Sequence, residues 1–194
     1  MFIDLSLPLR EMHEENTGQR EADLFRLGHH GTHLDRLLGS TIPLEYCKSR
    51  AILFDVSDFS SRRSVECDDV PLDLVRKDDF VLFRTGAMLR NPYASKDYMK
   101  EFIEFSWEMI ERLLAKDIRF IGLDARGLRM NEEHRKADTL CEKAGTYVIE
   151  NIANTERLPP AAPFTLHTAW FDAGGTGMPC KLIAETANEA YDAL

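Results

Sequence analysis

Short apolar runs constrain the fold of this 194-residue chain more than any other feature. Arg50–Val56 and Asp79–Thr85 are compact runs of Val, Leu, Ile and Phe, which is typical of buried strands. Arg119–Leu123 and Tyr147–Ile149 repeat the pattern. Further strands are expected near the two ends of the chain, at Phe2–Leu7, Ala22–His29, Phe164–Phe171 and Cys180–Glu185. So many strands beside few helices predict an α+β or mixed α/β fold, with residues 1–194 in a single domain.

Two longer segments show helical rather than strand periodicity. Lys96–Lys116 repeats apolar residues at helical spacing, and Ser95 is a plausible N-cap. Glu132–Lys143 is a second helical pattern, closed by Gly145. Arg10–Glu21 is polar and predicts a surface loop. The sequence therefore predicts two substantial helices against a larger number of strands.

The formal net charge of −9 narrows the class of partner. An acidic chain argues against nucleic acid and against an anionic membrane surface, because both require a basic patch. No apolar run is long enough to span a bilayer, and the N-terminus lacks the pattern of a signal peptide. The four cysteines are widely spaced and form no CxxC pair. We therefore expect a cytoplasmic protein with reduced thiols.

Half of the six histidines lie in the segment Gly28–Ser40. Neutral imidazoles and a carboxylate are ligands for a divalent ion such as zinc or manganese. Gly31 can turn the chain, and His33 and Asp35 share one side of an extended segment. Two readings are open, a metal site or a polar turn with surface histidines. The residues concerned are His29, His30, His33 and Asp35.

The same stretch, HHGTHLD at residues 29–35, resembles the HxGTHxD motif of the cyclase family of metal-dependent hydrolases. That family includes bacterial kynurenine formamidase and isatin hydrolase. Other segments resemble the family in order and spacing, so the likeness extends over nearly the whole chain. These segments are Asp4–Leu9, Val81–Gly86, Ile121–Asp124 and Val148–Ile152.

The resemblance implies a swivelling β/β/α-type fold in a homodimer or homotetramer. It also implies one or two Zn or Mn ions and hydrolysis of an amide, formamide or lactam bond in a small molecule. Carried over by position, His29, His33 and Asp35 would bind metal, and Glu150 would add a carboxylate from the second half of the chain. Asp35 would bridge two ions and so take part in catalysis.

Two positions depart from the family pattern, and both concern chemistry. The family motif continues to a histidine that serves as base or proton shuttle, where this chain has Gly39. The family also places a histidine ligand twelve residues before the glutamate, where this chain has Asp138. A carboxylate there would remain a ligand and favour Mn over Zn, because it is harder than imidazole.

The candidates to replace the missing base are His13, His30, His134 and His167. His30 is nearest in sequence and is the candidate catalytic histidine, with a surface role as the alternative. His134 lies one helical turn before Asp138, so it is a displaced ligand, a partner of a ligand or a solvated histidine. Three functions stay open: an amidohydrolase of the kynurenine formamidase type, a metal-binding protein with little or no activity, and a metal-dependent lyase or cyclase.

Overall fold

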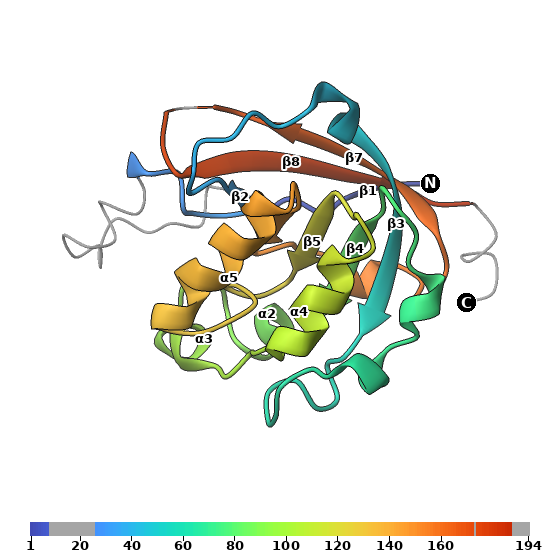
Figure 1. Ribbon diagram of the computed structural model, residues 1–194. Coiled ribbons are helices and arrows are strands. Elements are labelled where there is room, and N and C mark those ends of the chain that lie inside the picture. Colours follow the sequence, from blue (N-terminus) through green and yellow to red (C-terminus); the bar gives the residue numbers. More distant parts are fainter. Residues whose placement is uncertain (8–25, 173, 188–194) are drawn as a thin grey trace.

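The computed structural model describes residues 1–7, 26–172 and 174–187, and its strands form one sheet (Figure 1). The strand order is β1-β8-β2-β6-β5-β4-β3-β7, and β8 also pairs with β7. This additional pairing closes the sheet into a barrel-like ring and confirms the predicted mixed α/β fold class. The strands are β1 (Phe2–Asp4), β2 (His33–Asp35), β3 (Lys48–Asp55), β4 (Phe80–Arg84), β5 (Phe120–Leu123), β6 (Tyr147–Glu150), β7 (Phe164–Trp170) and β8 (Gly177–Glu185).

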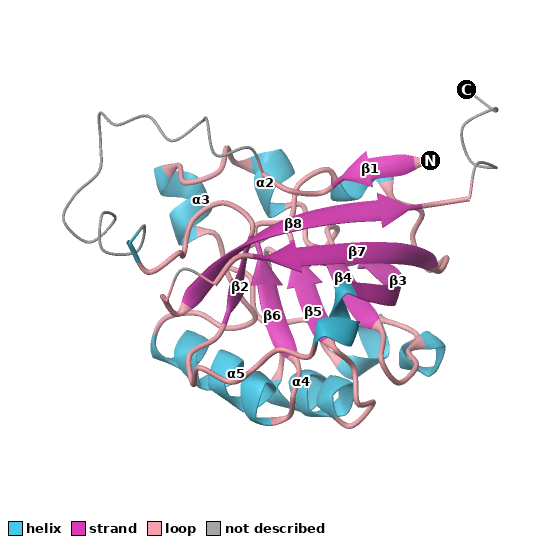
Figure 2. Cartoon of the chain, turned by 90° about the horizontal axis from the view of Figure 1, so that it is seen from above, coloured by secondary structure: helices cyan, strands magenta, loops and turns pink. Residues whose placement is uncertain are grey.

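The helices cover the parallel part of the sheet. Strands β3, β4, β5 and β6 are neighbours and run parallel, whereas β7, β8, β1 and β2 pair antiparallel. Figure 2 shows α4 and α5 on one side of β5 and β6, with β7 and β8 crossing on the other. Short 3₁₀ turns occupy residues 44–47, 67–69, 72–74 and 155–157. The α-helices are α2 (Ala87–Arg90), α3 (Lys96–Lys100), α4 (Trp107–Leu114) and α5 (Glu132–Lys143).

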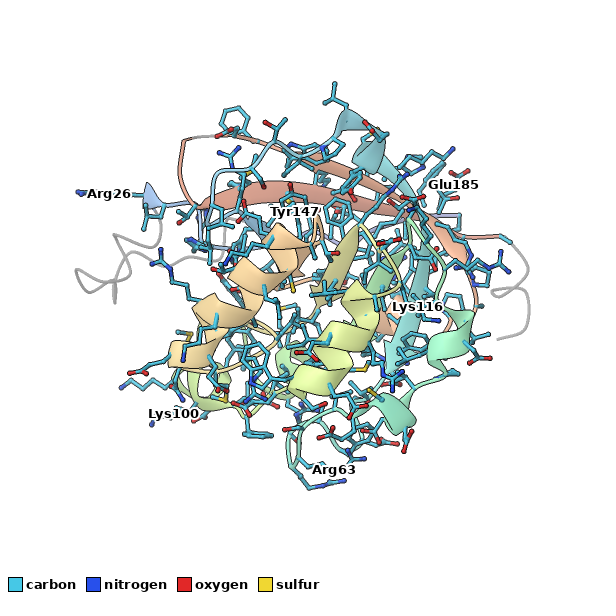
Figure 3. All side chains as sticks on the ribbon, viewed as in Figure 1. Arg26, Arg63, Lys100, Lys116, Tyr147 and Glu185 are labelled. Atoms are coloured by element: carbon cyan, nitrogen blue, oxygen red, sulfur yellow. The ribbon has the colours of Figure 1, made fainter. Side chains whose placement is uncertain are left out.

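Two apolar cores follow from the alternation of side chains along the parallel strands. On β3, Ile52 and Phe54 belong to the core beneath the helices, whereas Ala51 and Leu53 belong to the core inside the barrel. Such strands are buried on both faces, which explains why they read as continuous apolar runs. Figure 3 shows side chains filling the layer between α4, α5 and the sheet.

The segment predicted as one helix over Lys96–Lys116 is two helices, and that prediction is wrong. Ser95 caps α3 as expected, and its side chain accepts a hydrogen bond from the backbone N–H of Tyr98. The helix then stops because Phe105 donates its backbone N–H to Leu128 and pairs with Val65 in an isolated bridge. Tertiary hydrogen bonds thus override a continuous helical pattern.

A second secondary-structure prediction also fails. Residues 26–29, the described part of the strand expected at Ala22–His29, contain the end of a helix and a turn and no strand. The loop predicted at Arg10–Glu21 lies outside the described residues. The helix predicted at Glu132–Lys143 has the bounds of α5, and Gly145 follows it in a left-handed conformation at φ +78°.

No helix within residues 1–7, 26–172 and 174–187 combines the length and apolarity needed to cross a bilayer. All four cysteines are free thiols, as the sequence predicted. Cys141 belongs to α5 and is buried, whereas Cys47 is exposed. Packing and backbone pairing, rather than disulfide bonds, therefore hold these residues together.

Candidate metal centre

Strand β2 places a histidine and an aspartate in the interior of the protein. It pairs with β6 on one side and with β8 on the other, both antiparallel. This register sets His33 opposite Glu150 of β6 and opposite Pro179 of β8. His33 and Asp35 are each 2% exposed. Strand β2 has only three residues, so its position depends on pairing with β6 and β8, which come from the second half of the chain.

A glycine turn returns His29 to the same point. Gly28 has φ +85°, and a Cβ there would lie 2.0 Å from the carbonyl oxygen of Gly177. Only glycine allows this approach to β8. His29 Nδ1 consequently lies 3.3 Å from His33 Nε2 and 2.9 Å from Asp35 Oδ1. His29 Nε2 is held 2.8 Å from the hydroxyl of Thr176, which fixes the ring.

The hydrogen bonds of His33 determine which nitrogen faces the cluster. His33 Nδ1 lies 3.0 Å from the carbonyl oxygen of Gly31, so in the neutral ring this nitrogen carries the proton and donates it. Its Nε2 lone pair then points toward Asp35 Oδ1 at 3.4 Å and Glu150 Oε2 at 3.6 Å. With no proton between them, the lone pairs of this nitrogen and of the two carboxylate oxygens repel one another. A bound cation would instead attract all three.

Helix α5 and strand β6 supply the other half of the cluster. His134 and Asp138 are one helical turn apart, and His134 Nε2 lies 3.3 Å from Asp138 Oδ2. The same nitrogen lies 3.6 Å from Glu150 Oε1 and 3.8 Å from Asp35 Oδ2. Asp138 and Glu150 are buried, whereas the side chain of His134 is 34% exposed.

The six side chains thus form two overlapping groups that share Asp35. The first group contains His29, His33 and Asp35, and the second contains Asp35, His134, Asp138 and Glu150. Within each group the potential ligand atoms lie within 4.8 Å of one another. All five residues expected to bind metal converge here. His134, for which the sequence left three interpretations open, joins them, and its i, i+4 spacing to Asp138 was the signal for it.

The carboxylates of this cluster lack ordinary partners. Both oxygens of Asp35, both oxygens of Asp138 and Oε1 of Glu150 are buried without a hydrogen bond. Burial, together with the negative charge of Asp35, raises the pKa of Asp138 and of Glu150 well above the usual range. Burial would also raise the pKa of Asp35, but the neighbouring imidazoles of His29 and His33 outweigh it and lower that pKa. Buried polar atoms without partners require an explanation.

A divalent cation fits this donor set. Three imidazole nitrogens and three carboxylates converge, and each carboxylate charge that burial disfavours would be offset by the ion. Imidazole with carboxylate is a ligand set that suits zinc, manganese or iron, and the high share of oxygen favours the harder ions. Each of the two groups could hold a divalent ion, and they share Asp35.

The two remaining positions of interest lie outside these groups. His30 is buried, and burial, with the charge of nearby His33, lowers its pKa. Gly39 is exposed at φ +71°, and nothing described lies within 4 Å of where its Cβ would be. Its loop is held by Glu142 of α5, which accepts hydrogen bonds from the backbone of Leu38 and Ser40. The space directly around a Cβ at position 39 is therefore empty of described atoms.

A cavity of about 670 Å³ lies near the carboxyl ends of β4, β5 and β6. It is lined in part by Tyr93, whose hydroxyl accepts a hydrogen bond from the backbone N–H of Gly31. None of the six clustered side chains lines it. The cluster itself is open to solvent through His134 and, to a lesser extent, His29, whose side chain is 16% exposed. The most exposed side chain of the cluster is therefore His134, on α5.

Comparisons with known proteins agree with this geometry. Structures similar to this chain include a potential metal-dependent hydrolase with cyclase activity, at 22% identity and a TM-score of 0.70 over 95% of this chain and 96% of the other. Isatin hydrolase A from Labrenzia aggregata, bound to benzyl benzoate, matches at 18% identity and a TM-score of 0.70, over 95% of this chain and 93% of the other. A predicted metal-dependent hydrolase from Bacillus stearothermophilus matches at 21% identity and a TM-score of 0.68, over 95% of this chain and 97% of the other.

These likenesses establish the shared fold. A search of curated proteins finds no match. The model of the Cyclase family, described as "Putative cyclase", matches residues 3–128, which is about two thirds of the chain and includes the HHGTHLD segment. The chain belongs to the cyclase family.

Proposed function

We propose that this protein is a metal-dependent hydrolase of a carbon–nitrogen bond in a small amide, formamide or lactam. The convergence of two histidine and carboxylate groups on Asp35 carries the proposal. The shared fold with isatin hydrolase supports it, although that likeness by itself concerns architecture. The ions we propose are Zn or Mn, one in each group.

The side chains of this cluster have separable tasks. A bound divalent ion supplies Lewis-acid activation of a carbonyl group and of water. Asp35 holds the two groups together, Thr176 and Gly31 fix the rings of His29 and His33, and burial excludes competing water. Glu150 and the α5 residues complete the second group.

Proton transfer is the task for which the described part of the chain shows no dedicated residue. We propose His30 for it, because His30 is adjacent to His29 and its lowered pKa, caused by burial and by His33, keeps the ring neutral. A positioned acid or base contributes about 10²- to 10⁴-fold in rate. Exchanging His30 for Gln is expected to lower the turnover rate by this factor while the metal content stays unchanged.

The first test combines elemental analysis with substrate screening. The protein is purified without an affinity tag or chelator and incubated with Zn or Mn, beside His33→Ala. One to two equivalents of metal, reduced in the variant, together with hydrolysis of isatin, formanilide or a related lactam, would support the proposal. Binding of metal without hydrolysis of any member of such a panel would contradict the hydrolase function while leaving the metal site intact.

A second function is favoured by Gly39, namely a metal-binding protein with little hydrolase activity. The position has room for a side chain, although a residue other than glycine at φ +71° is strained by about 1 kcal/mol. Gly39→His distinguishes the two functions, with Gly39→Asn as the matched control for backbone strain. A rate gain with His alone indicates a weakened hydrolase. Equal rates in both variants, with bound metal, favour a binding role.

A further inference from the structure

Among the arginines that the structure describes, one beside the cluster differs from the others of comparable burial in having no carboxylate partner. Six arginines in the described ranges are half-buried. Five of them form an ion pair with a carboxylate, as expected for a charge partly removed from water. Arg126 forms none with any described residue, and its Nη1 lies 3.9 Å from Met99 Sδ. The five pairs are Arg36–Asp172, Arg50–Asp79, Arg84–Asp55, Arg119–Asp78 and Arg129–Glu133.

The backbone next to Arg126 lies directly against the cluster. Arg126 belongs to the segment between β5 and α5 and precedes Gly127. A Cβ on Gly127 would lie 2.4 Å from His134 Nδ1 and 2.8 Å from Glu150 Oε1. No larger residue could bring the chain so close. Arg126 is therefore one residue from a point of contact with both His134 and Glu150.

The charge of Arg126 reaches the open side of the cluster. Burial lowers the pKa of His134, and the positive charge of Arg126 lowers it further. On Glu150 the same charge opposes the rise in pKa caused by burial, Asp35 and Asp138. His134 is the most exposed member of the cluster. The charge of Arg126 thus acts on Glu150 and on the most exposed side chain of the cluster.

We propose that Arg126 binds an anionic group, most simply a carboxylate, on the small molecule that reaches the cluster. A guanidinium matches a carboxylate in charge and in its paired donors. The surroundings would otherwise repel such a molecule, because three carboxylates converge in the cluster and the chain carries a formal net charge of −9. The inference rests on the proposed function for the reaction and adds the substrate class, a carbon–nitrogen substrate that carries a negative charge.

A competing explanation is that Arg126 only offsets the charge of the three carboxylates. The two roles predict different results for Arg126→Gln. A pure counter-charge would repel a cation, so its removal would tighten metal binding and leave the preference between charged and neutral ligands unchanged. A binding role predicts that the preference itself changes.

The experiment measures dissociation constants by calorimetry for benzoate and benzamide, two probes of similar shape that differ in charge. The proteins are the wild type, Arg126→Gln, Arg126→Lys and Arg76→Gln. Arg76 is exposed and precedes β4, so its exchange matches the loss of charge away from the cluster. Each titration is run with and without added Mn²⁺, and the metal content of every sample is determined.

We expect the preference for benzoate over benzamide to fall about 10- to 100-fold in Arg126→Gln, to persist in part in Arg126→Lys and to remain in Arg76→Gln. A change below about twofold, an equal change in Arg76→Gln, or no binding of benzoate to the wild type at millimolar concentration would overturn the inference. The titrations without metal keep this result separate from the proposed function, because they do not depend on metal uptake or turnover.

Discussion

The two halves of the metal centre are built in different ways. The histidine half, His29 with His33 and Asp35, comes from seven consecutive residues, and a glycine turn and one short strand shape it. The carboxylate half combines two residues of α5 with one of β6, shares Asp35 with the first half and also contacts it between Glu150 and His33. Its carboxylates are buried and lack hydrogen bonds, whereas the histidine rings are held by Thr176 and Gly31.

This difference indicates how each half depends on a cation. The histidine half has its orienting hydrogen bonds in place, so its geometry is set before metal arrives. The carboxylate half concentrates negative charge in a buried place, where an ion or a proton must offset it. We therefore expect the two halves to respond differently when ligands or ions are removed.

The largest effect is expected from Asp35→Asn, which affects both halves together. Loss of a residue that merely orients a ligand costs about 10- to 100-fold in metal affinity, and a shared ligand should cost more. Both ions should therefore be lost, and hydrolysis with them, as measured by elemental analysis and turnover. Asp172→Asn removes an exposed carboxylate as a control. Retention of one full equivalent in Asp35→Asn would show that the halves are independent.

Single histidine exchanges should separate the halves. His33→Ala is expected to lose the ion of the histidine half, and His134→Ala that of the carboxylate half, so each variant retains about one equivalent. Titration with Mn²⁺ followed by elemental analysis measures the stoichiometry. His167→Ala, which alters a partly exposed histidine paired with Glu185, serves as the control. If His134→Ala keeps the full metal content, His134 is a neighbour of the site and not a ligand.

Metal removal should destabilise the fold by a smaller but measurable amount. An ion present at about 100 times its dissociation constant stabilises the native state by about 2.7 kcal/mol. For a chain of this size, that corresponds to a loss of about 5–10 °C in Tm on chelation. Differential scanning calorimetry with and without chelator tests this. An unchanged Tm on chelation and on re-addition of Zn or Mn would argue that neither half holds an ion.

The smallest effect concerns the choice of ion. Asp138→His replaces a carboxylate by the imidazole that the family places here, so the carboxylate half should shift toward Zn over Mn by about tenfold. Competition titrations between Zn and Mn on Asp138→His and the wild type measure this ratio. Asp138→Asn provides the control for loss of charge alone. An equal shift in both variants would assign the preference to charge and not to the type of ligand.

The sequence was most informative where structure depends on neighbours in the chain. Compact apolar runs identified the parallel strands, and the caps at Ser95 and Gly145 were correct, because these signals depend on neighbouring residues in the chain. The helix over Lys96–Lys116 failed where Phe105 bonds to Leu128, a contact between distant segments. The strand expected at Ala22–His29 failed in its described part because Gly28 turns the chain against β8.

The candidate site divides in the same way. The spacing of His29, His33 and Asp35 by itself determined one half, because seven residues can converge only by a local turn. That Glu150 lies opposite His33, and that α5 presents His134 together with Asp138, was decided by strand register and helix packing. Arg126 had no signal in the sequence at all. Arg126 stands out because it has no carboxylate partner among the described residues. Which charges pair is decided only when the chain folds.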